Sequence, residues 1–266
     1  MSFVTIGSLS DRGNRKDKNE DYFAFHVPAD ENILQKGVLL ILADGMGGRA
    51  GGEIASKVTV ETIMDGFYSS ESSSISESLN NALLKANDEV LSRGDADRAI
   101  QGMASTAVAA VIKKDKLYYA SVGDSRIYLI KKNEIIRLTE DHSIVAGLVK
   151  AGYISEKDSA SYPGGNVITR AIGLKPGLKV DVSKSGLKIK PGQYVMLCCD
   201  GLHKDIPDED IVTVFNDLKN PQSICEELVN KALKKGGDDN ITVLIARIDK
   251  TGRGLFSELT DRLFSD

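Results

Sequence analysis

Apolar positions along the chain follow two spacings, one typical of strands and the other typical of helices. Residues 37–43 (GVLLILA) form an unbroken apolar run, which predicts a strand buried on both faces. Residues 3–9 and 22–27 alternate well enough between apolar and polar positions to predict strands beside it. Residues 53–68 and 76–92 carry apolar side chains at helical spacing, so we expect two amphipathic helices there.

The rest of the chain shows strands in series rather than strands alternating with helices. Short strands are predicted one after another between residues 105 and 138, with Asp115 and Asn133 in tight turns. This order favours an α+β fold built on antiparallel sheet. The remaining pattern predicts strands at 178–184, 193–199 and 241–248 and helices at 208–215 and 222–234.

Composition and charge mainly exclude certain classes of protein. The 266 residues suffice for one large domain with a sizeable core, and the net charge of −4 argues against general nucleic-acid binding. The longest apolar run is too short to span a bilayer, and no basic segment followed by an apolar one predicts a signal peptide. The 3 cysteines lack a CxxC spacing, so we expect a reduced, cytoplasmic protein.

The candidate chemistry lies in aspartates at turn-like positions, several of which follow apolar runs. Carboxylates gathered at one edge of a sheet repel each other unless a cation joins them, and hard divalent cations bind oxygen ligands alone. The sequence therefore predicts a multinuclear magnesium or manganese site. Its candidate ligands are Asp21, Asp44, Asp124, Asp200 and Asp239.

Asp44 is the natural carboxylate to bridge two ions, because it ends the long apolar run and is followed by glycine. We expect the bare backbone of Gly45 to let its carbonyl approach a metal. Two divalent ions about 3.5–4 Å apart lower the pKa of the water between them, and the resulting hydroxide can attack phosphorus in line. The site therefore predicts hydrolysis of a phosphoester.

Four basic residues precede Asp21, and one of them is expected to hold the phosphate against repulsion by the carboxylates. An arginine fork binds two phosphate oxygens, whereas a lysine acts as a point charge. The alternative is that these residues form only a solvated basic loop. They are Arg12, Arg15, Lys16 and Lys18.

Short motifs occur in a fixed order from residue 11 to about residue 248. In this order they resemble the motifs of the PP2C-type (PPM) metal-dependent serine/threonine protein phosphatases, specifically the compact bacterial branch. A single DG or GD pair is weak evidence, whereas the ordered set is specific. The motifs are NED at 19–21, DGMGG at 44–48, GMAST at 102–106, SVGDSR at 121–126, TEDHS at 139–143, CDGL at 199–202 and GDDNIT at 237–242.

The resemblance implies a four-layer α/β/β/α sandwich, with helices outside, two antiparallel sheets inside and the metals at one edge of the sheets. It also implies one phosphatase domain over residues 1–249, with a flap at about 143–165 beside the active site. The extension 250–266 has apolar residues on one face of a helix predicted from residue 254. We expect this helix to pack on its own domain.

The resemblance also implies metal roles for the aspartates. Asp44 is expected to bridge two Mn²⁺ or Mg²⁺ ions. Asp200 and Asp239 are expected to complete the ligands of the first ion. The Gly45 carbonyl, with Asp21 directly or through water, is expected to serve the second ion.

Further implications concern a third ion, the reaction and its partners. Asp124 resembles the residue that, with Asp200, holds a third, weaker ion in bacterial members. The implied reaction is hydrolysis of phosphoserine and phosphothreonine in proteins. The implied partners are a serine/threonine kinase and its phosphorylated targets, and we expect a monomer that binds neither nucleic acid nor membrane.

Two positions depart from the family pattern. The family's phosphate-binding arginine usually stands five residues before the NED aspartate, where this chain has Lys16. Either Arg15 reaches in from one position earlier, which we favour, or Lys16 contacts the phosphate. Met46 stands where many eukaryotic relatives carry a histidine proposed as general acid, and methionine cannot donate a proton. A metal-bound water or His142 is then the donor, and we favour a structural role for His142.

Other interpretations stay open. The segment 45–50 fits a loose dinucleotide-binding pattern, although Asp44 would face the pyrophosphate with like charge. A pseudophosphatase would usually lack a metal aspartate, and none is missing. A phosphatase of a small phosphorylated metabolite would keep the same metal chemistry. Of the neighbouring acids, Asp238 is expected to be a turn residue and Asp141 to cap a helix that begins at Ser143.

Overall fold

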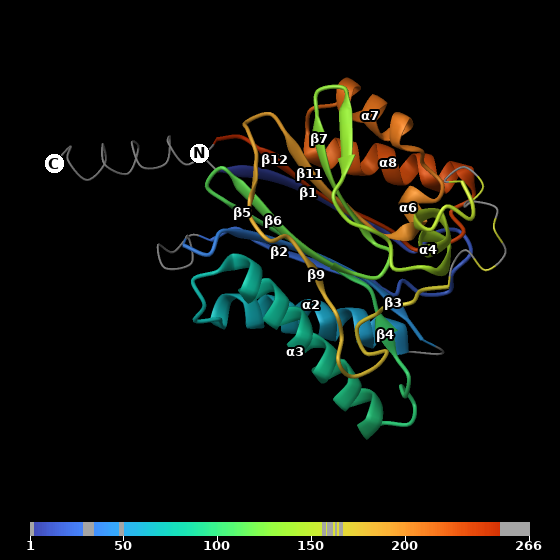
Figure 1. The fold of residues 1–266 in the computed structure, drawn as a ribbon. Coiled ribbons are helices and arrows are strands. Elements are labelled where there is room, and N and C mark those ends of the chain that lie inside the picture. Colours follow the sequence, from blue (N-terminus) through green and yellow to red (C-terminus); the bar gives the residue numbers. More distant parts are fainter. Residues whose placement is uncertain are drawn as a thin grey trace.

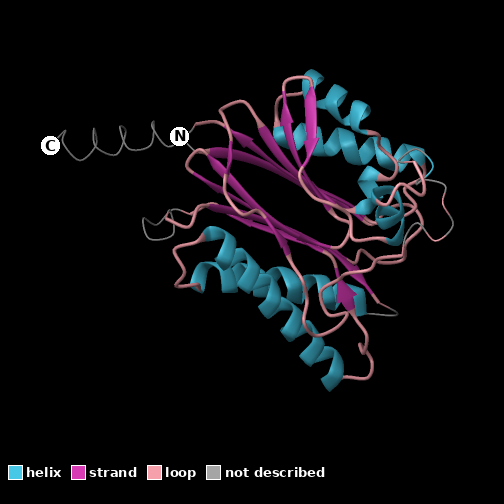
Figure 2. Ribbon diagram, viewed as in Figure 1, coloured by secondary structure: helices cyan, strands magenta, loops and turns pink. Residues whose placement is uncertain are grey.

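The computed structural model describes residues 3–28, 35–47, 51–155, 158, 162, 164 and 167–250. Two antiparallel β-sheets lie face to face, and helices cover the outer face of each (Figure 1; Figure 2). This arrangement confirms the α+β sandwich that the resemblance implies. In the described ranges, no helix is long and apolar enough to cross a membrane. The helix predicted from residue 254 lies outside these ranges, so it and the domain boundary at residue 249 stay predictions.

The first sheet joins strands from both ends of the chain. β1 (Val4–Asp11) pairs with β12 (Ile241–Ile248) along its whole length. The sheet continues in order through β11 (Tyr194–Cys198), β7 (Arg126–Lys131) and β8 (Glu134–Arg137). The last strand of the chain therefore lies between its first strand and β11.

The second sheet is built from the strands predicted around the long apolar run. Neighbouring strands pair antiparallel throughout, and short strands extend the sheet at β3 and β6. Its members are β2 (Asp21–His26), β3 (Val38–Met46), β4 (Ala104–Ser105), β5 (Ala107–Lys113), β6 (Lys116–Val122), β9 (Asp181–Val182) and β10 (Leu187–Lys188).

Most of the strand predicted at 178–184 is wrong. Within this segment the structure assigns only residues 181–182 to a strand, β9, which pairs with β6. Leu178 and Val180 are nonetheless buried in the core between the second sheet and its helices. Their alternation reflects packing of an irregular segment, which a strand pattern cannot distinguish from pairing.

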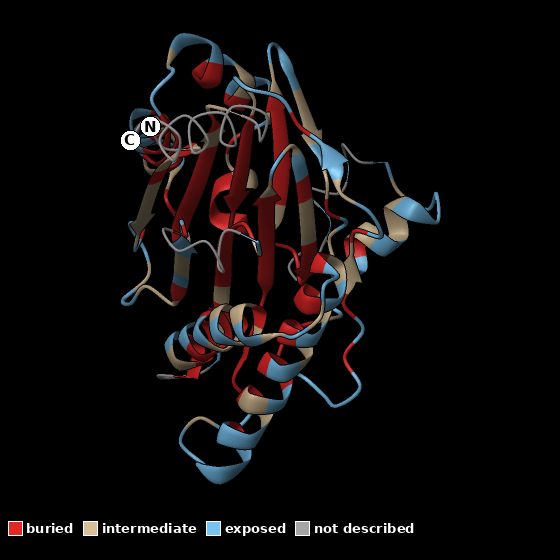
Figure 3. Ribbon diagram, turned by 90° about the vertical axis from the view of Figure 1, so that its left-hand side faces the viewer, coloured by how far each residue is buried: buried red, intermediate tan, exposed pale blue. Residues whose placement is uncertain are grey.

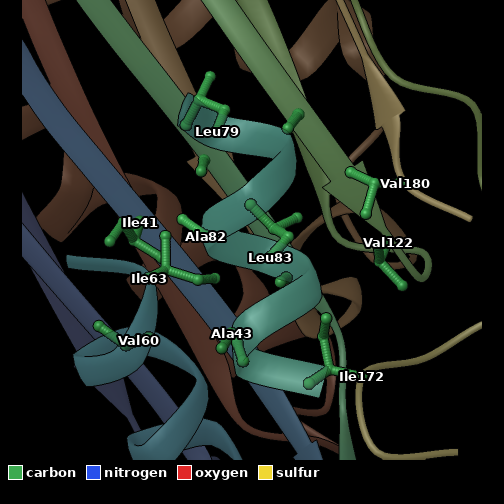
Figure 4. Close-up of a cluster of buried hydrophobic side chains, with 14 of the residues drawn as sticks. Ile41, Ala43, Val60, Ile63, Leu79, Ala82, Leu83, Val122, Ile172 and Val180 are labelled. Carbon is green, nitrogen blue, oxygen red and sulfur yellow. The ribbon is translucent and has the colours of Figure 1, made fainter. Parts of the chain in front are cut away.

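The apolar run in β3 is explained by its position between two cores. Ile41 and Ala43 face α2 (Gly51–Ser69) and α3 (Ile75–Ala96), whereas Leu40 faces the other sheet. Figure 3 shows the strands as a largely buried layer, and in Figure 4 the labelled Ile41 and Ala43 lie near side chains of both helices. Because both faces are covered, β3 has no polar alternation along this run.

The remaining helices cover the first sheet and one end of the sandwich. α7 (Asp208–Asp217) and α8 (Pro221–Lys235) pack on the first sheet, as Figure 1 shows. α4 (Ile144–Lys150) and α6 (Asp200–His203) are short and lie at the end where β3 terminates.

The start of α4 corrects one expectation. Ser143 is the N-cap, and its hydroxyl accepts the Ala146 N–H at 3.2 Å. Asp141 instead forms a salt bridge with Arg126, with 2.7 Å between Arg126 Nη2 and Asp141 Oδ2. The guanidinium offers this carboxylate several hydrogen bonds, whereas a helix cap offers fewer.

Candidate active site

The site begins at the paired strands β2 and β3, whose register places Asp21 directly opposite Asp44. Asp44 lies within β3, because Gly45 and Met46 still pair with β4. The prediction that Asp44 ends its strand is therefore wrong. The β4 ladder instead holds the backbone beyond this carboxylate in a fixed position.

Three further aspartates come from the start of a helix and from two connections between elements. Asp200 begins α6 directly after β11, Asp239 precedes β12, and Asp124 lies between β6 and β7. The charge of Asp44 interacts with all three of them and with Asp21. The structure thus brings together all five aspartates that the sequence singled out, from both sheets.

Burial and mutual repulsion perturb these carboxyl groups. Burial raises the pKa of Asp44 well above its usual range, and the neighbouring aspartates raise it further. Burial also raises the pKa of Asp21 to about 7, and burial together with Asp200 raises the pKa of Asp124 to about 7. Burial acts in the same direction on Asp200, but the Lys204 ammonium outweighs it and lowers the pKa. Raised pKa values at Asp21, Asp44 and Asp124 indicate that positive charge is missing around these three carboxyl groups.

The donor set fits hard divalent cations. Asp21, Asp124 and Asp200 each keep one buried carboxylate oxygen, Oδ1, without a hydrogen-bond partner among the described residues. A buried carboxylate oxygen without a partner is costly unless a cation binds it. Oxygen donors of this kind are the ligands that Mg²⁺ and Mn²⁺ prefer.

The aspartates do not form a closed metal cage in this structure. In the described part of the chain, no three His, Cys, Asp or Glu side chains are arranged as a finished metal site. Two ammonium groups take up part of the donor set instead. Lys16 Nζ lies 2.6 Å from Asp239 Oδ1, and Lys204 Nζ bonds to Asp200 Oδ2. Metal binding therefore requires these side chains to rearrange.

Two hydroxyl residues hold the backbone of Asp44. Thr106 Oγ1 accepts the Asp44 N–H at 2.9 Å, and the Thr106 N–H donates to the Asp44 carbonyl at 2.8 Å. Ser105 Oγ donates to the same carbonyl at 2.9 Å. Thr106 Oγ1 also lies 2.7 Å from Ser125 Oγ, next to Asp124. Our sequence analysis quoted these residues within motifs but assigned them no role.

We expect Thr106→Val to lower the free energy of unfolding by about 1–3 kcal/mol, because it leaves the buried Asp44 N–H without its acceptor. Urea denaturation measures the change. Thr213→Val is a matched control, since the Thr213 hydroxyl bonds to Glu209 of its own helix on the exposed face. Its cost should stay within about 0.5 kcal/mol. Equal stabilities of the two variants would contradict the role given to Thr106.

Asn240 has a structural role that was not predicted from the sequence. Its buried side chain accepts the Glu20 N–H at 2.8 Å and donates to the carbonyls of Arg12 and Lys18, both at 2.8 Å. These bonds fix the basic loop, residues 12–20, against the start of β12. The available signal was an asparagine next to a buried strand, a residue type that often bonds to backbone groups.

The two leading candidates for the phosphate contact both lie in the basic loop, and each pairs with a different aspartate. Arg15 Nε lies 2.7 Å from Asp238 Oδ1, and both side chains are more than 70% exposed, at 74% and 72%. Lys16 and its partner Asp239 are each 41% exposed. Of these two candidates in the basic loop, Lys16 is therefore the one that contacts the aspartate cluster, while Asp238 lies outside the cluster.

Two histidines support the turn that carries Asp124. His142 Nδ1 accepts the Gly123 N–H at 3.0 Å, and its Nε2 lies 3.1 Å from Asp181 Oδ2. Both ring nitrogens are therefore engaged, which favours the structural role. His203 Nε2–H donates to the Asp124 carbonyl at 3.0 Å, and burial lowers the pKa of His203 to about 4. This second contact was not foreseen.

Gly45 is required by packing. A Cβ at this position would lie 2.0 Å from the Gly52 carbonyl oxygen and 2.6 Å from the Glu20 carbonyl oxygen. The Gly45 N–H also donates to Glu20 at 3.1 Å. The close approach of α2 to β3 explains this glycine, and the contact of its carbonyl with a metal stays a prediction.

Known proteins share this fold and sequence. The chain matches the Protein phosphatase 2C family over residues 12–236. The serine/threonine phosphatase stp of Listeria monocytogenes is 31% identical over 249 residues, which cover 92% of this chain and 96% of that protein. The S. agalactiae serine/threonine phosphatase structure has a TM-score of 0.84 at 33% identity, covering 93% of this chain and 100% of that one.

A further structure bears on the metal. The catalytic domain of the serine/threonine protein phosphatase PstP, in complex with 2 manganese ions, has a TM-score of 0.78 at 27% identity. The match covers 93% of this chain and 99% of that one. The similarities to these relatives extend over more than 90% of the chain. The chain therefore belongs to the protein phosphatase 2C family of metal-dependent serine/threonine protein phosphatases.

Proposed function

We propose that the five-aspartate cluster holds two Mn²⁺ or Mg²⁺ ions and hydrolyses phosphoserine and phosphothreonine in proteins. One observation carries this proposal: buried carboxylates repel each other there, and three of them keep an oxygen that has no hydrogen-bond partner within the described part of the chain. Such a cluster is stable only when positive charge is added to it.

The proposed ligands follow from the positions of the aspartates. Asp44 interacts with every other member of the cluster, so its carboxylate would be the ligand common to both ions. Asp200 and Asp239 complete the ligands of one ion. Asp21 and the Gly45 carbonyl serve the other. When bound, the ions lower the pKa of a water molecule and neutralise charge that develops on the phosphoryl group.

A third, weaker ion is proposed between Asp124 and Asp200, whose Oδ1 atoms both lack a partner among the described residues. The chain itself orients the donors. Thr242 Oγ1 donates to Asp21 Oδ2 at 2.6 Å, which leaves Oδ1 for a cation. Thr106 holds the backbone of Asp44 by a hydrogen bond, and His203 holds the backbone of Asp124 by another.

We place the phosphate contact on Lys16 rather than on Arg15. The Lys16 ammonium already contacts the cluster at Asp239, whereas Arg15 contacts the exposed Asp238. Once a metal takes Asp239, the ammonium is released beside the site and can bind a phosphate oxygen. As a point charge it supplies attraction without the bidentate geometry of arginine.

A protein substrate suits this site better than a small metabolite. Among the described residues, two cavities of about 360 Å³ are lined by residues 169–179 and by residues of β2 and α2, and no cluster aspartate lines either of these two. Small ligands prefer enclosed cavities. The cluster is instead reachable from the surface, where Lys16 and Asp239 are 41% exposed. A serine/threonine kinase and its phosphorylated targets are the proposed partners.

Metal removal tests this function directly. In EDTA, release of phosphate from a phosphothreonine peptide should fall to background, and added Mn²⁺ should restore it, because uncompensated carboxylates repel the phosphate dianion. A colorimetric phosphate assay measures both states. Full turnover in EDTA would contradict the metal proposal. Faster release from small phosphomonoesters than from the peptide would contradict a protein substrate.

A further inference from the structure

Lys204 is placed by the fold directly on one of the proposed metal ligands. It follows α6, and its backbone N–H donates to the Asp200 carbonyl at 3.0 Å. Its ammonium bonds to Asp200 Oδ2. The Asp200 side chain is 13% exposed and that of Lys204 is 38% exposed. The lysine therefore reaches from the surface onto a mostly buried carboxylate.

The charges around Lys204 belong mainly to the half of the site formed by Asp124 and Asp200. The Lys204 ammonium interacts electrostatically with Asp200, with which it also forms a hydrogen bond, and then with Asp124 and Asp239. The Asp124 carboxyl group in turn interacts with both Asp200 and Lys204. The ammonium thus supplies positive charge where the third cation is proposed to bind.

Lys204 differs from Lys16 in how firmly it is held there. Lys16 lies on the basic loop, and its contact with Asp239 is 41% exposed on both sides. Lys204 is attached one helical turn from its partner, at an i,i+4 spacing that keeps the two side chains within reach. The backbone itself therefore places the Lys204 side chain beside Asp200.

We infer that Lys204 is a tethered counter-ion of the Asp124–Asp200 half of the site and competes with the third divalent cation. The inference rests on the proposed function, because it takes these aspartates as metal ligands. A cation that binds Asp200 Oδ1 lies beside the ammonium on Oδ2, and a cation that binds both oxygens must displace the ammonium, so in either case the affinity for the cation falls. The other two ions are affected less, because Asp21, Asp44 and Asp239 also hold them.

Binding of Mn²⁺ to the whole protein tests this inference without using activity. Isothermal titration calorimetry gives affinities and stoichiometry, and the paramagnetic resonance signal of free Mn²⁺ checks them. Lys204→Met removes the charge at similar length, and Lys204→Arg keeps the charge. Lys231→Met is the matched control, because Lys231 forms an i,i+4 pair with Glu227 on α8, at 3.8 Å.

We expect Lys204→Met to bind its weakest Mn²⁺ at least about tenfold more tightly than the wild type. Lys204→Arg and Lys231→Met should match the wild type. Unchanged or weaker binding by Lys204→Met would overturn the inference, while binding of two ions by the wild type would leave the proposed function standing. Failure of all four proteins to bind Mn²⁺ would overturn the proposed function itself.

If Lys204→Met is unstable without metal, thermal unfolding provides a second test of the inference. Loss of the ammonium leaves the buried Asp200 charge uncompensated, so the metal-free variant should have a lower Tm than the wild type. Tighter Mn²⁺ binding should then raise the Tm of the variant by more than that of the wild type. Equal Mn²⁺-induced rises in the two proteins would also overturn the inference.

Discussion

Asp44→Asn is expected to lower kcat/KM for a phosphothreonine peptide by about 10³-fold or more at saturating Mn²⁺. Asp44 interacts with all four other aspartates of the cluster, so the substitution removes the ligand proposed to be shared by both ions. Asparagine keeps the side-chain size and the backbone bonds to Thr106. The loss should therefore appear in the kinetics while the circular dichroism spectrum stays that of the wild type.

Asp238→Asn is the control for this experiment. Asp238 is the direct neighbour of a proposed ligand, but its side chain is 72% exposed and pairs with Arg15 outside the cluster. Its activity should stay within about twofold of the wild type, since exposed ion pairs contribute little. More than a tenth of wild-type activity in Asp44→Asn would exclude Asp44 as the bridging ligand. A comparable loss in Asp238→Asn would show that Asp239 had been chosen wrongly.

The same Asp44→Asn substitution is expected to stabilise the metal-free protein by about 1–3 kcal/mol at pH 7. Burial and the neighbouring carboxylates raise the pKa of Asp44 above its value in the unfolded chain, which is about 3.9. The folded protein thus retains a proton that the unfolded chain releases. The contribution of Asp44 to stability therefore falls as the pH rises from about 4 toward the raised pKa. Asparagine does not ionise and avoids this loss.

Urea denaturation in EDTA at pH 5 and pH 7 measures this effect. The advantage of Asp44→Asn over the wild type should be larger at pH 7, and Asp238→Asn should show no comparable advantage. Saturating Mn²⁺ should reverse the order, because the wild type gains more binding free energy than the variant. An Asp44→Asn protein that is less stable than the wild type in EDTA at pH 7 would refute the electrostatic strain assigned to this cluster.

At this site, the groups needed for activity reduce the stability of the metal-free protein. The carboxylates that bind metal are the ones that repel each other in its absence, and Lys16 and Lys204 relieve part of that repulsion. Stabilising the metal-free cluster should therefore weaken metal binding, as in active sites that carry strain for function. The Lys204 variants test this relation by removing or keeping a positive charge beside the cluster. Asp44→Asn tests it by removing one of the carboxylates.

Local spacing was sufficient for most elements of the fold. The run at 37–43 became the interior strand β3, and the helical pattern at 53–68 became α2 with nearly the same bounds. Both patterns record which faces are buried, and burial on regular faces is a property of neighbouring residues. The segment 178–184 failed because Leu178 and Val180 are buried without forming a strand.

The sequence by itself determined the family and the five candidate aspartates. Acidic residues and glycines that follow one another in a fixed order along the chain indicate this chemistry, and that order can be read without knowing the fold. It also contained the i,i+4 spacing of Asp200 and Lys204, but not its meaning. Only the tertiary structure decided which groups hold the site, such as Thr106 on Asp44 and Asn240 on the basic loop. These hydrogen bonds join residues 62 and 228 positions apart. Such partners are set by strand register and by packing between the sheets, and no local pattern specifies them.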